Sequence, residues 1–259
     1  MRIDVHAALG SFPFRPHPAG TVDGLRETMA ANGIDEAWVS SLSAVHWRDP
    51  SAGNAELYEQ LQDHPALRPV PALNPGFSGV ERTLDQARAA GAAALRVDPT
   101  IAGLDHTGGA MIELAAAAAE RGLPLFLAVK LEDVRQRHPG DRAPALDPST
   151  LRTLVRAAPR ARFVVAAADR GFIEQVHWGS TPAEAERILW DVSWIWGPPE
   201  DDLDHLVRAI GAERFCFGTG YPLRIAGSSV VKLELTPLTP AQRARIESDN
   251  ARSFAGGRS

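Results

Sequence analysis

The chain has 259 residues, a net charge of −5 and an apolar fraction of 44%, which is ordinary for a globular protein with a full core. The negative charge disfavours nucleic acid and anionic membranes as partners, since both select basic surfaces. Cys216 is the only cysteine, so no disulfide forms within the chain, and a lone thiol in an apolar run suits a reducing compartment. With no export segment at the start and no apolar run of about 18 residues, we expect a soluble cytoplasmic protein.

Eight short apolar runs are spaced along the chain, and we predict that each is a β-strand. Most are continuously apolar rather than alternating, which is typical of parallel strands covered by helices on their outer face. The runs are 3–7, 36–42, 68–73, 93–97, 123–130, 162–167, 187–193 and 214–218.

Helical stretches with recognisable ends separate these runs. Thr21 is placed to cap a helix whose Leu25 and Met29 share one face, and Gly33 is placed to end it before the second strand. Towards the end of the chain, residues 239–242 (Thr-Pro-Ala-Gln) match a capping box with proline at the first helical position. The chain therefore alternates strands and helices throughout its length.

This alternation predicts a TIM (β/α)8 barrel, formed by a single domain over residues 1–259. The alternative is a doubly wound open sheet, which usually has fewer strands and often carries a glycine-rich phosphate-binding turn after the first strand. Residues 8–12 (Ala-Leu-Gly-Ser-Phe) do not fit such a turn, and no repeat or linker divides the chain.

A barrel forms its functional site at the carboxyl ends of the strands, in the loops that lead into the helices. Aromatic residues on this rim indicate either an apolar or aromatic ligand or packing between the loops. The fifth loop, 130–138, is long and charged, and it is interpreted either as a lid over the mouth or as a solvated surface. The residues expected in rim loops include Trp47, Trp178, Trp194, Trp196, Arg15, His17, His46 and His106.

Several motifs follow one another in the order that the barrel requires. The chain opens with residues 3–6 (Ile-Asp-Val-His), residues 71–75 (Pro-Ala-Leu-Asn-Pro) follow the third strand, and residues 190–194 (Trp-Asp-Val-Ser-Trp) close the seventh. The last strand leads into residues 214–222 (Arg-Phe-Cys-Phe-Gly-Thr-Gly-Tyr-Pro). Over nearly its whole length the chain resembles the amidohydrolase-related family, which includes metal-dependent hydrolases and decarboxylases of the aminocarboxymuconate-semialdehyde type. The resemblance implies a hydrolase or decarboxylase on a barrel.

The resemblance also implies a divalent metal, held by two histidines on strand one, one histidine each from strands five and six, and an aspartate on strand eight. Such an ion lowers the pKa of its bound water, so that hydroxide exists near neutral pH. His6 matches the first ligand, but the other positions hold Ala8, Ala128, Ala167 and Gly220. One imidazole does not hold zinc against water, so we predict that the usual metal site does not form and that no cofactor is bound.

Other polar side chains are predicted at the same mouth. Residues two apart on a strand point the same way, so the polar groups two positions beyond the missing ligands are expected to face the site. The predicted catalytic residues are His6, Asp98 and Asp191. The predicted substrate-binding residues are Arg96, Lys130, Asp169, Trp194, Tyr221 and His138.

Three functions are compatible with these residues. In each, we expect the protein to bind a small molecule, and a homodimer is a possible assembly. The first is a metal-free hydrolase or decarboxylase of a small organic acid, amide or ester, in which His6 transfers protons while Arg96 and Lys130 hold a carboxylate or oxyanion. The second is a relocated site for Mg, Mn or Zn, built from His6, Asp98, Asp169 and Asp191. The third is a barrel that binds a ligand or partner without catalysis, its buried charges pairing with one another.

Overall fold

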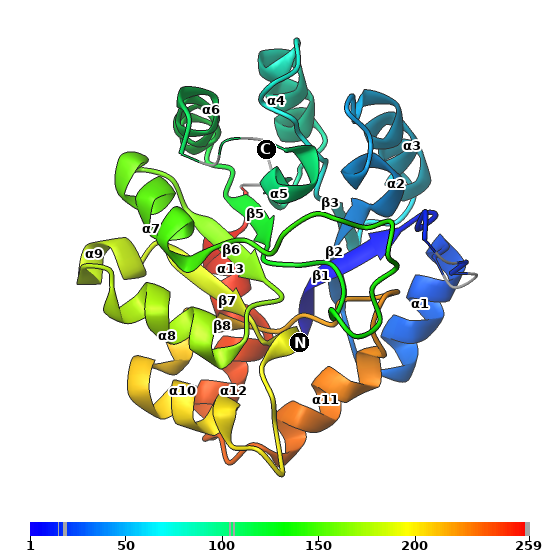
Figure 1. The fold of residues 1–259 in the computed structure, drawn as a ribbon. Helices are drawn as coiled ribbons and strands as arrows, with labels where there is room; N and C mark the ends of the chain where they lie inside the picture. Colours follow the sequence, from blue (N-terminus) through cyan, green and yellow to red (C-terminus); the bar gives the residue numbers. More distant parts are fainter. Residues whose placement is uncertain (15, 18–19, 104, 106, 257–259) are drawn as a thin grey trace.

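A ring of eight parallel strands, surrounded by helices, forms the centre of the computed structural model (Figure 1). The structure describes residues 1–14, 16–17, 20–103, 105 and 107–256; Arg15 and His106, expected in rim loops, lie outside these residues. The strands are β1 (Ile3–Leu9), β2 (Glu36–Ser41), β3 (Leu67–Pro69), β4 (Leu95–Arg96), β5 (Leu125–Ala128), β6 (Phe163–Ala166), β7 (Ile188–Asp191) and β8 (Phe215–Cys216). Each predicted strand is therefore present, most of them shorter than predicted.

The strands pair in chain order as two parallel sheets, β1-β2-β3 and β4-β5-β6-β7-β8. Backbone hydrogen bonds join the sheets at both seams. The amide of Arg96 donates to the carbonyl of Pro71 (2.9 Å), and the amide of Val5 donates to the carbonyl of Phe217 (3.0 Å). The predicted TIM barrel is confirmed, and the open-sheet alternative is wrong.

Helices follow most strands and cover the outer face of the ring. Thr21 caps the first one by accepting a hydrogen bond from the amide of Gly24, and Thr239 forms the predicted capping box with Gln242. Among the described residues, no helix has the length and apolar character that crossing a bilayer requires. The helices are α1 (Val22–Ala31), α2 (Leu42–Val45), α3 (Ser51–Leu61), α4 (Val80–Ala89), α5 (Pro99–Ala102), α6 (Gly109–Glu120), α7 (Pro148–Ala157), α8 (Arg170–Trp178), α9 (Pro182–Ala185), α10 (Asp202–Ile210), α11 (Ala226–Leu235), α12 (Pro240–Ala244) and α13 (Asn250–Phe254), with short 3₁₀ turns at Val192–Trp194 and Ala212–Arg214 and a π-helical turn at Arg245–Asp249.

One apolar cluster fills the inside of the ring, and each strand, or a residue next to it, contributes a side chain to it. Trp38 and Phe126 are among its largest members, and Cys216 lies in the same cluster. Burial, with the negative charges of Asp191 and Asp4 nearby, raises the pKa of the Cys216 thiol well above its ordinary value. This thiol therefore packs in the core as a small apolar group.

The C-terminal segment closes the amino end of the ring, and Figure 1 shows α13 near the centre of the ring. The amide of Gly256 donates to the carbonyl of Ala93 (2.8 Å), and the guanidinium of Arg68 donates to the carbonyl of Gly256 (2.7 Å). Ala251 of α13 joins the interior cluster. The other end of the ring, where the strands have their carboxyl ends, is where a site can form.

The loop after β5 runs across this open end, and Figure 1 shows it in front of β1 and β2. Leu131 packs against a small cluster that contains Ala8 and Phe12, and the ring of His138 stacks on Phe14 with centroids 5.3 Å apart. The loop therefore has the position of a lid over the mouth.

The expectation that Trp178 lies on the rim is wrong. Trp178 is the last residue of α8, which runs from the carboxyl end of β6 back towards the amino end of the ring, and 64% of its surface is exposed. Trp47, Trp194 and Trp196 follow β2 and β7 and lie on the rim as expected.

Asn54 holds the seam between the two sheets, which generates a first prediction. Its buried amide exchanges two hydrogen bonds with the backbone of Ala72, one at 2.7 Å and one at 2.8 Å, next to the point where Ala72 pairs with Arg96. We expect Asn54→Ala to lower the free energy of unfolding by about 2–3 kcal/mol, because both backbone groups lose their partners. Urea unfolding measures this, with the exposed Glu59→Ala of the same helix as the control. Equal stability of the two variants would contradict the role assigned to Asn54.

Candidate active site

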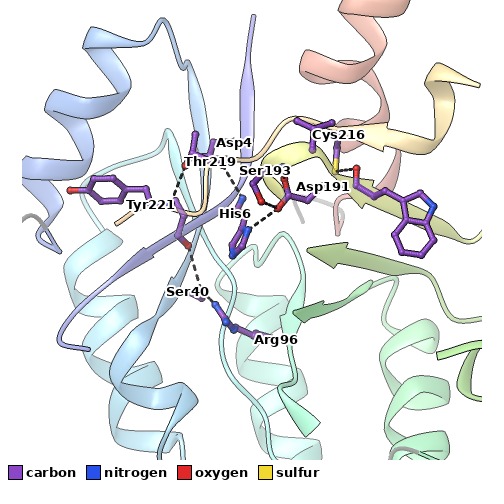
Figure 2. A network of polar contacts seen from close by, with 12 residues as sticks. Asp4, His6, Ser40, Arg96, Asp191, Ser193, Cys216, Thr219 and Tyr221 are labelled. Carbon is purple, nitrogen blue, oxygen red and sulfur yellow. Dashed lines mark hydrogen bonds and ion pairs between the residues drawn. The ribbon is translucent and has the colours of Figure 1, made fainter. Parts of the chain in front are cut away.

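His6 lies at the mouth because β1 is irregular there. The pairing of β1 with β2 shifts register between Asp4 and Ala7, and such a bulge re-aims the side chains within it. The Nδ1 atom of His6 lies 2.7 Å from Oδ2 of Asp191, at the end of β7, and its ring contacts Phe126 with centroids 5.3 Å apart. Figure 2 shows the imidazole turned towards Asp191. No described residue bonds the other ring nitrogen, Nε2.

Asp191 is fully buried and is held by the turn that follows it. Its Oδ1 accepts a hydrogen bond from the amide of Ser193 (2.7 Å), and its Oδ2 accepts one from the Ser193 hydroxyl (2.5 Å). Burial by itself raises the pKa of this carboxyl, but the hydrogen bond and charge of His6, with the two donors of Ser193, outweigh it and hold the pKa below its ordinary value. Asp191 is therefore an anion that fixes the imidazole of His6.

A second buried carboxylate, Asp4, joins the first and last strands. It accepts hydrogen bonds from the amide of His6 (2.9 Å), the amide of Thr219 (3.0 Å) and the hydroxyl of Thr219 (2.6 Å). Burial raises the pKa of Asp4, and these donors only partly offset the rise. Its contacts are with the backbone and side chain of the barrel wall, so Asp4 positions His6.

Arg96 and Asp98 pair with each other. The Nε of Arg96 lies 2.6 Å from Asp98, its Nη1 donates to the hydroxyl of Ser40 (2.8 Å), and its guanidinium lies over the ring of Phe126. Both charged side chains are buried. The guanidinium predicted to bind substrate is already neutralised, and the carboxylate predicted to be catalytic is turned towards it.

Lys130 and Arg224 place two cations against one indole ring. The Nζ of Lys130 lies 4.6 Å from the centre of the Trp194 ring, and the guanidinium of Arg224 lies 4.4 Å from the same centre. Lys130 is also 3.6 Å from the half-exposed carboxylate of Asp169, which caps α8 by accepting a hydrogen bond from the amide of Phe172. Trp194 follows Asp191 by three residues, so this cationic cluster lies beside the histidine–aspartate pair.

Two predicted site residues lie elsewhere. The ring of Tyr221 is buried, its hydroxyl bonds to Thr28 of α1, and Figure 2 shows it directed away from His6. His138 is exposed in the lid loop, where its Nδ1 accepts a hydrogen bond from the amide of Gly140. Tyr221 therefore supports the barrel wall, and His138 contributes to the packing of the lid.

Lys232 of α11 is a residue that strand spacing does not reveal. Its largely buried ammonium donates to the carbonyl of Val192 (2.6 Å) and lies 3.3 Å from the carbonyl of Ser193. It therefore holds the short turn that in turn holds Asp191. Its sequence signal is weak, because a lysine in an amphipathic helix usually faces solvent.

The residues at the mouth do not fit the metal that the family resemblance implies. At the positions that the resemblance assigns to ligands, Ala8, Ala128 and Gly220 offer no side-chain donor. Nor do His, Cys, Asp and Glu side chains gather in groups of three or more that could hold an ion within the part of the chain that the structure describes. Asp98 and Asp169 are paired separately with Arg96 and Lys130, so the relocated oxygen-rich site has no support either.

The closed (β/α)8 barrel and its polar mouth place this chain in the class of TIM-barrel enzyme scaffolds. A family model described as amidohydrolase matches residues 18–256. The chain belongs to the amidohydrolase family, which confirms the resemblance seen in its motifs.

Solved structures share this fold over almost the whole chain. One is assigned as a 2-pyrone-4,6-dicarboxylic acid hydrolase from Pseudomonas putida, with a TM-score of 0.72 and 20% identity, covering 98% of this chain and 96% of the other. A 2,6-dihydroxybenzoate decarboxylase from Rhizobium has a TM-score of 0.72 and 17% identity, covering 98% of each chain. A dihydroxybenzoic acid decarboxylase from Polaromonas with bound manganese has a TM-score of 0.73 and 14% identity, covering 98% and 96%. Among curated proteins, none matches the chain.

The close approach of β8 to the histidine–aspartate pair generates a second prediction. A Cβ added at Gly218 would collide with Oδ1 of Asp191 and lie 3.0 Å from the Cβ of His6. We expect Gly218→Ala to lower the free energy of unfolding by about 1–3 kcal/mol. The control is Gly171→Ala in α8, where an added Cβ meets only Asp169, at 3.7 Å, and a helical alanine is neutral or stabilising. If Gly218→Ala is as stable as the control in urea unfolding, the packing described for β8 is refuted.

The buried ammonium of Lys232 generates a third prediction. Burial lowers its pKa from 10.5 to about 8. The unfolded chain regains the ordinary pKa, so between about pH 8 and pH 10.5 the unfolded state binds more protons, and stability rises with pH. The cost of burying the charge is fully present below this window and is relieved above it. We expect the unfolding free energy of the wild type, minus that of Lys232→Met, to rise by about 2 kcal/mol across the window. A flat difference would show that the ammonium is not desolvated.

Proposed function

We propose that this protein is a metal-independent hydrolase or decarboxylase of a small organic acid, with His6 as the group that transfers protons. The observation that supports this most directly is the 2.7 Å contact of the His6 Nδ1 with the buried Asp191. A buried carboxylate on one ring nitrogen fixes the tautomer and stabilises the imidazolium, which leaves Nε2 to act on a ligand at the mouth.

The chemistry follows from this arrangement for both reactions. In hydrolysis, Nε2 of His6 takes a proton from water as its oxygen attacks the acyl carbon, and the imidazolium then gives that proton to the leaving group. In decarboxylation, protonated His6 gives its proton to the carbon that loses carbon dioxide. In both, the ammonium of Lys130, held beside Trp194, is the cation proposed to bind the substrate carboxylate in place of the neutralised Arg96.

Family membership supports this choice of reactions. The structural neighbours include decarboxylases of dihydroxybenzoic acids and a protein assigned as a hydrolase of a pyrone dicarboxylic acid. All of these named compounds are small carboxylic acids. We extend the two reaction types and this substrate class to the chain as parts of the proposal.

A second candidate is a barrel that binds its ligand without catalysis. The observation that favours it is the pairing of the mouth's charges with one another, Arg96 with Asp98 and Lys130 with Asp169. In that case His6 and Asp191 are a structural pair. A cytoplasmic location, a single domain over residues 1–259 and a homodimer stay predictions, and the buried thiol of Cys216 supports the first.

Substitution of His6 separates the two candidates. Against a panel of dihydroxybenzoates and pyrone dicarboxylates, measured by substrate loss and carbon dioxide release, we expect wild-type turnover. His6→Gln should lower kcat by about 10²–10⁴-fold, because general acid–base catalysis contributes this much. Asp191→Asn should lower it as well, because the amide holds the wrong tautomer of the imidazole. His205→Gln, on the exposed face of α10, is the control. Turnover that survives in His6→Gln would rule out the proposed role of His6.

A further inference from the structure

A groove of about 650 Å³ lies beside the mouth, outside the ring of strands. Its walls are the segment after β7, from Trp194 to Glu200, the helix α11, and three residues at the start of the lid loop, Asp133, Arg135 and Gln136. Ligand-binding clefts commonly have volumes of about 300–1,000 Å³. The groove begins at Trp194 and Arg224, two side chains already placed beside Asp191, so it leads away from the histidine–aspartate pair.

Arg224 is the charged group at the inner end of this groove. Its Nε is buried without a hydrogen-bond partner, and within the described residues its guanidinium makes no ion pair or hydrogen bond. Burial lowers the pKa of Arg224, and Asp191 and Asp133 offset this only in part. Arg187, another partly buried arginine, by contrast donates to three backbone carbonyls. A partly buried guanidinium that no carboxylate contacts directly is incompletely compensated, so its position indicates a site for a negatively charged ligand group.

Gly220 makes room for this arginine. A Cβ at Gly220 would lie 2.9 Å from the Cδ of Arg224, and the backbone there has a φ of +73°, which favours glycine. Gly220 is also the position at which the family resemblance expects a metal-binding aspartate. The aliphatic stem of Arg224 therefore occupies the space that such a side chain would need, and it brings a fixed positive charge to this part of the mouth.

The outer wall of the groove is aliphatic. Ile225, Val231 and Leu235 are 81%, 50% and 59% exposed, and Trp196 opposite them is 54% exposed. The three aliphatic residues span ten positions at the start of and along α11, which corresponds to about 15 Å. Exposed apolar side chains that line a cleft with a cation at one end match an elongated ligand that has an anionic head and an apolar body.

We propose that this groove binds a linear aliphatic carboxylate of medium length, with its carboxylate on the guanidinium of Arg224 and its chain along α11. The groove adjoins the histidine–aspartate site, and its ligand is proposed in addition to the substrate whose carboxylate Lys130 binds, so this inference goes beyond the proposed function. Its test measures binding alone, so the two can fail separately.

Octanoate and the neutral octanamide, which has the same shape, are the probes for isothermal titration calorimetry with the full chain. We expect Arg224→Met to weaken octanoate binding at least about tenfold, or about 1.4 kcal/mol, and to leave octanamide within about threefold. Val231→Asp should weaken both probes, because it places a charge in the aliphatic wall. Arg208→Met, on the exposed face of α10, is the control and should bind both probes as the wild type does. Thermal unfolding confirms that each variant is folded.

The result that overturns the inference is wild-type protein that does not bind octanoate, or that binds it equally well without Arg224. Butyrate that binds as tightly as octanoate would also overturn it, since the aliphatic wall would then contribute nothing. His6→Gln separates the two proposals, because it should bind octanoate like the wild type. Binding that depends on Arg224 together with no turnover of any acid would leave the groove established and the proposed reaction rejected.

Discussion

The mouth of this barrel depends on one buried anion, Asp191. Its carboxylate is removed from water, yet two donors of Ser193 and the imidazole of His6 keep its pKa low. Lys232 fixes the backbone of the same turn from behind. Removing any of these contacts leaves a buried charge less well satisfied, which is costly in a low-dielectric interior. The position of His6 follows from this arrangement.

The same mouth shows how a family scaffold can carry different polar groups on an unchanged ring. At the positions where the family resemblance expects donors for an ion, small side chains stand, and three cations lie nearby: Lys130, Arg224 and the neutralised Arg96. Fixed cations can stabilise a carboxylate or an oxyanion, although they do not activate water as a bound ion does. Proton transfer is therefore assigned to His6, and its contact with Asp191 is the main support for the proposed function.

Much of the fold could be predicted from the sequence, because continuous apolar runs and helix caps are local signals. The strand ends were less predictable. β2 stops at Ser41 because Ser41 caps α2, and β7 stops at Asp191 because Asp191 caps the turn that follows. The sequence motifs place His6 and Asp191 at one end of the ring, where the structure joins them, although His6 faces the mouth through a break in the alternation of β1. The alternation of side chains along strands did not show that Arg96 and Asp98, two residues apart, would form an ion pair with each other. Arg224 and Lys232 could not be placed at the site from the sequence, because a loop and a helix, rather than a strand, position them.

The most direct test of this account is the metal content of the purified protein after it is equilibrated with zinc and manganese and then separated from free ions. The account predicts less than one ion per chain, and the same content in His6→Ala as in the wild type, since one imidazole without neighbouring donors holds no ion firmly. One ion per chain that disappears in His6→Ala would contradict it, because His6 would then be a ligand and not the group that moves the proton.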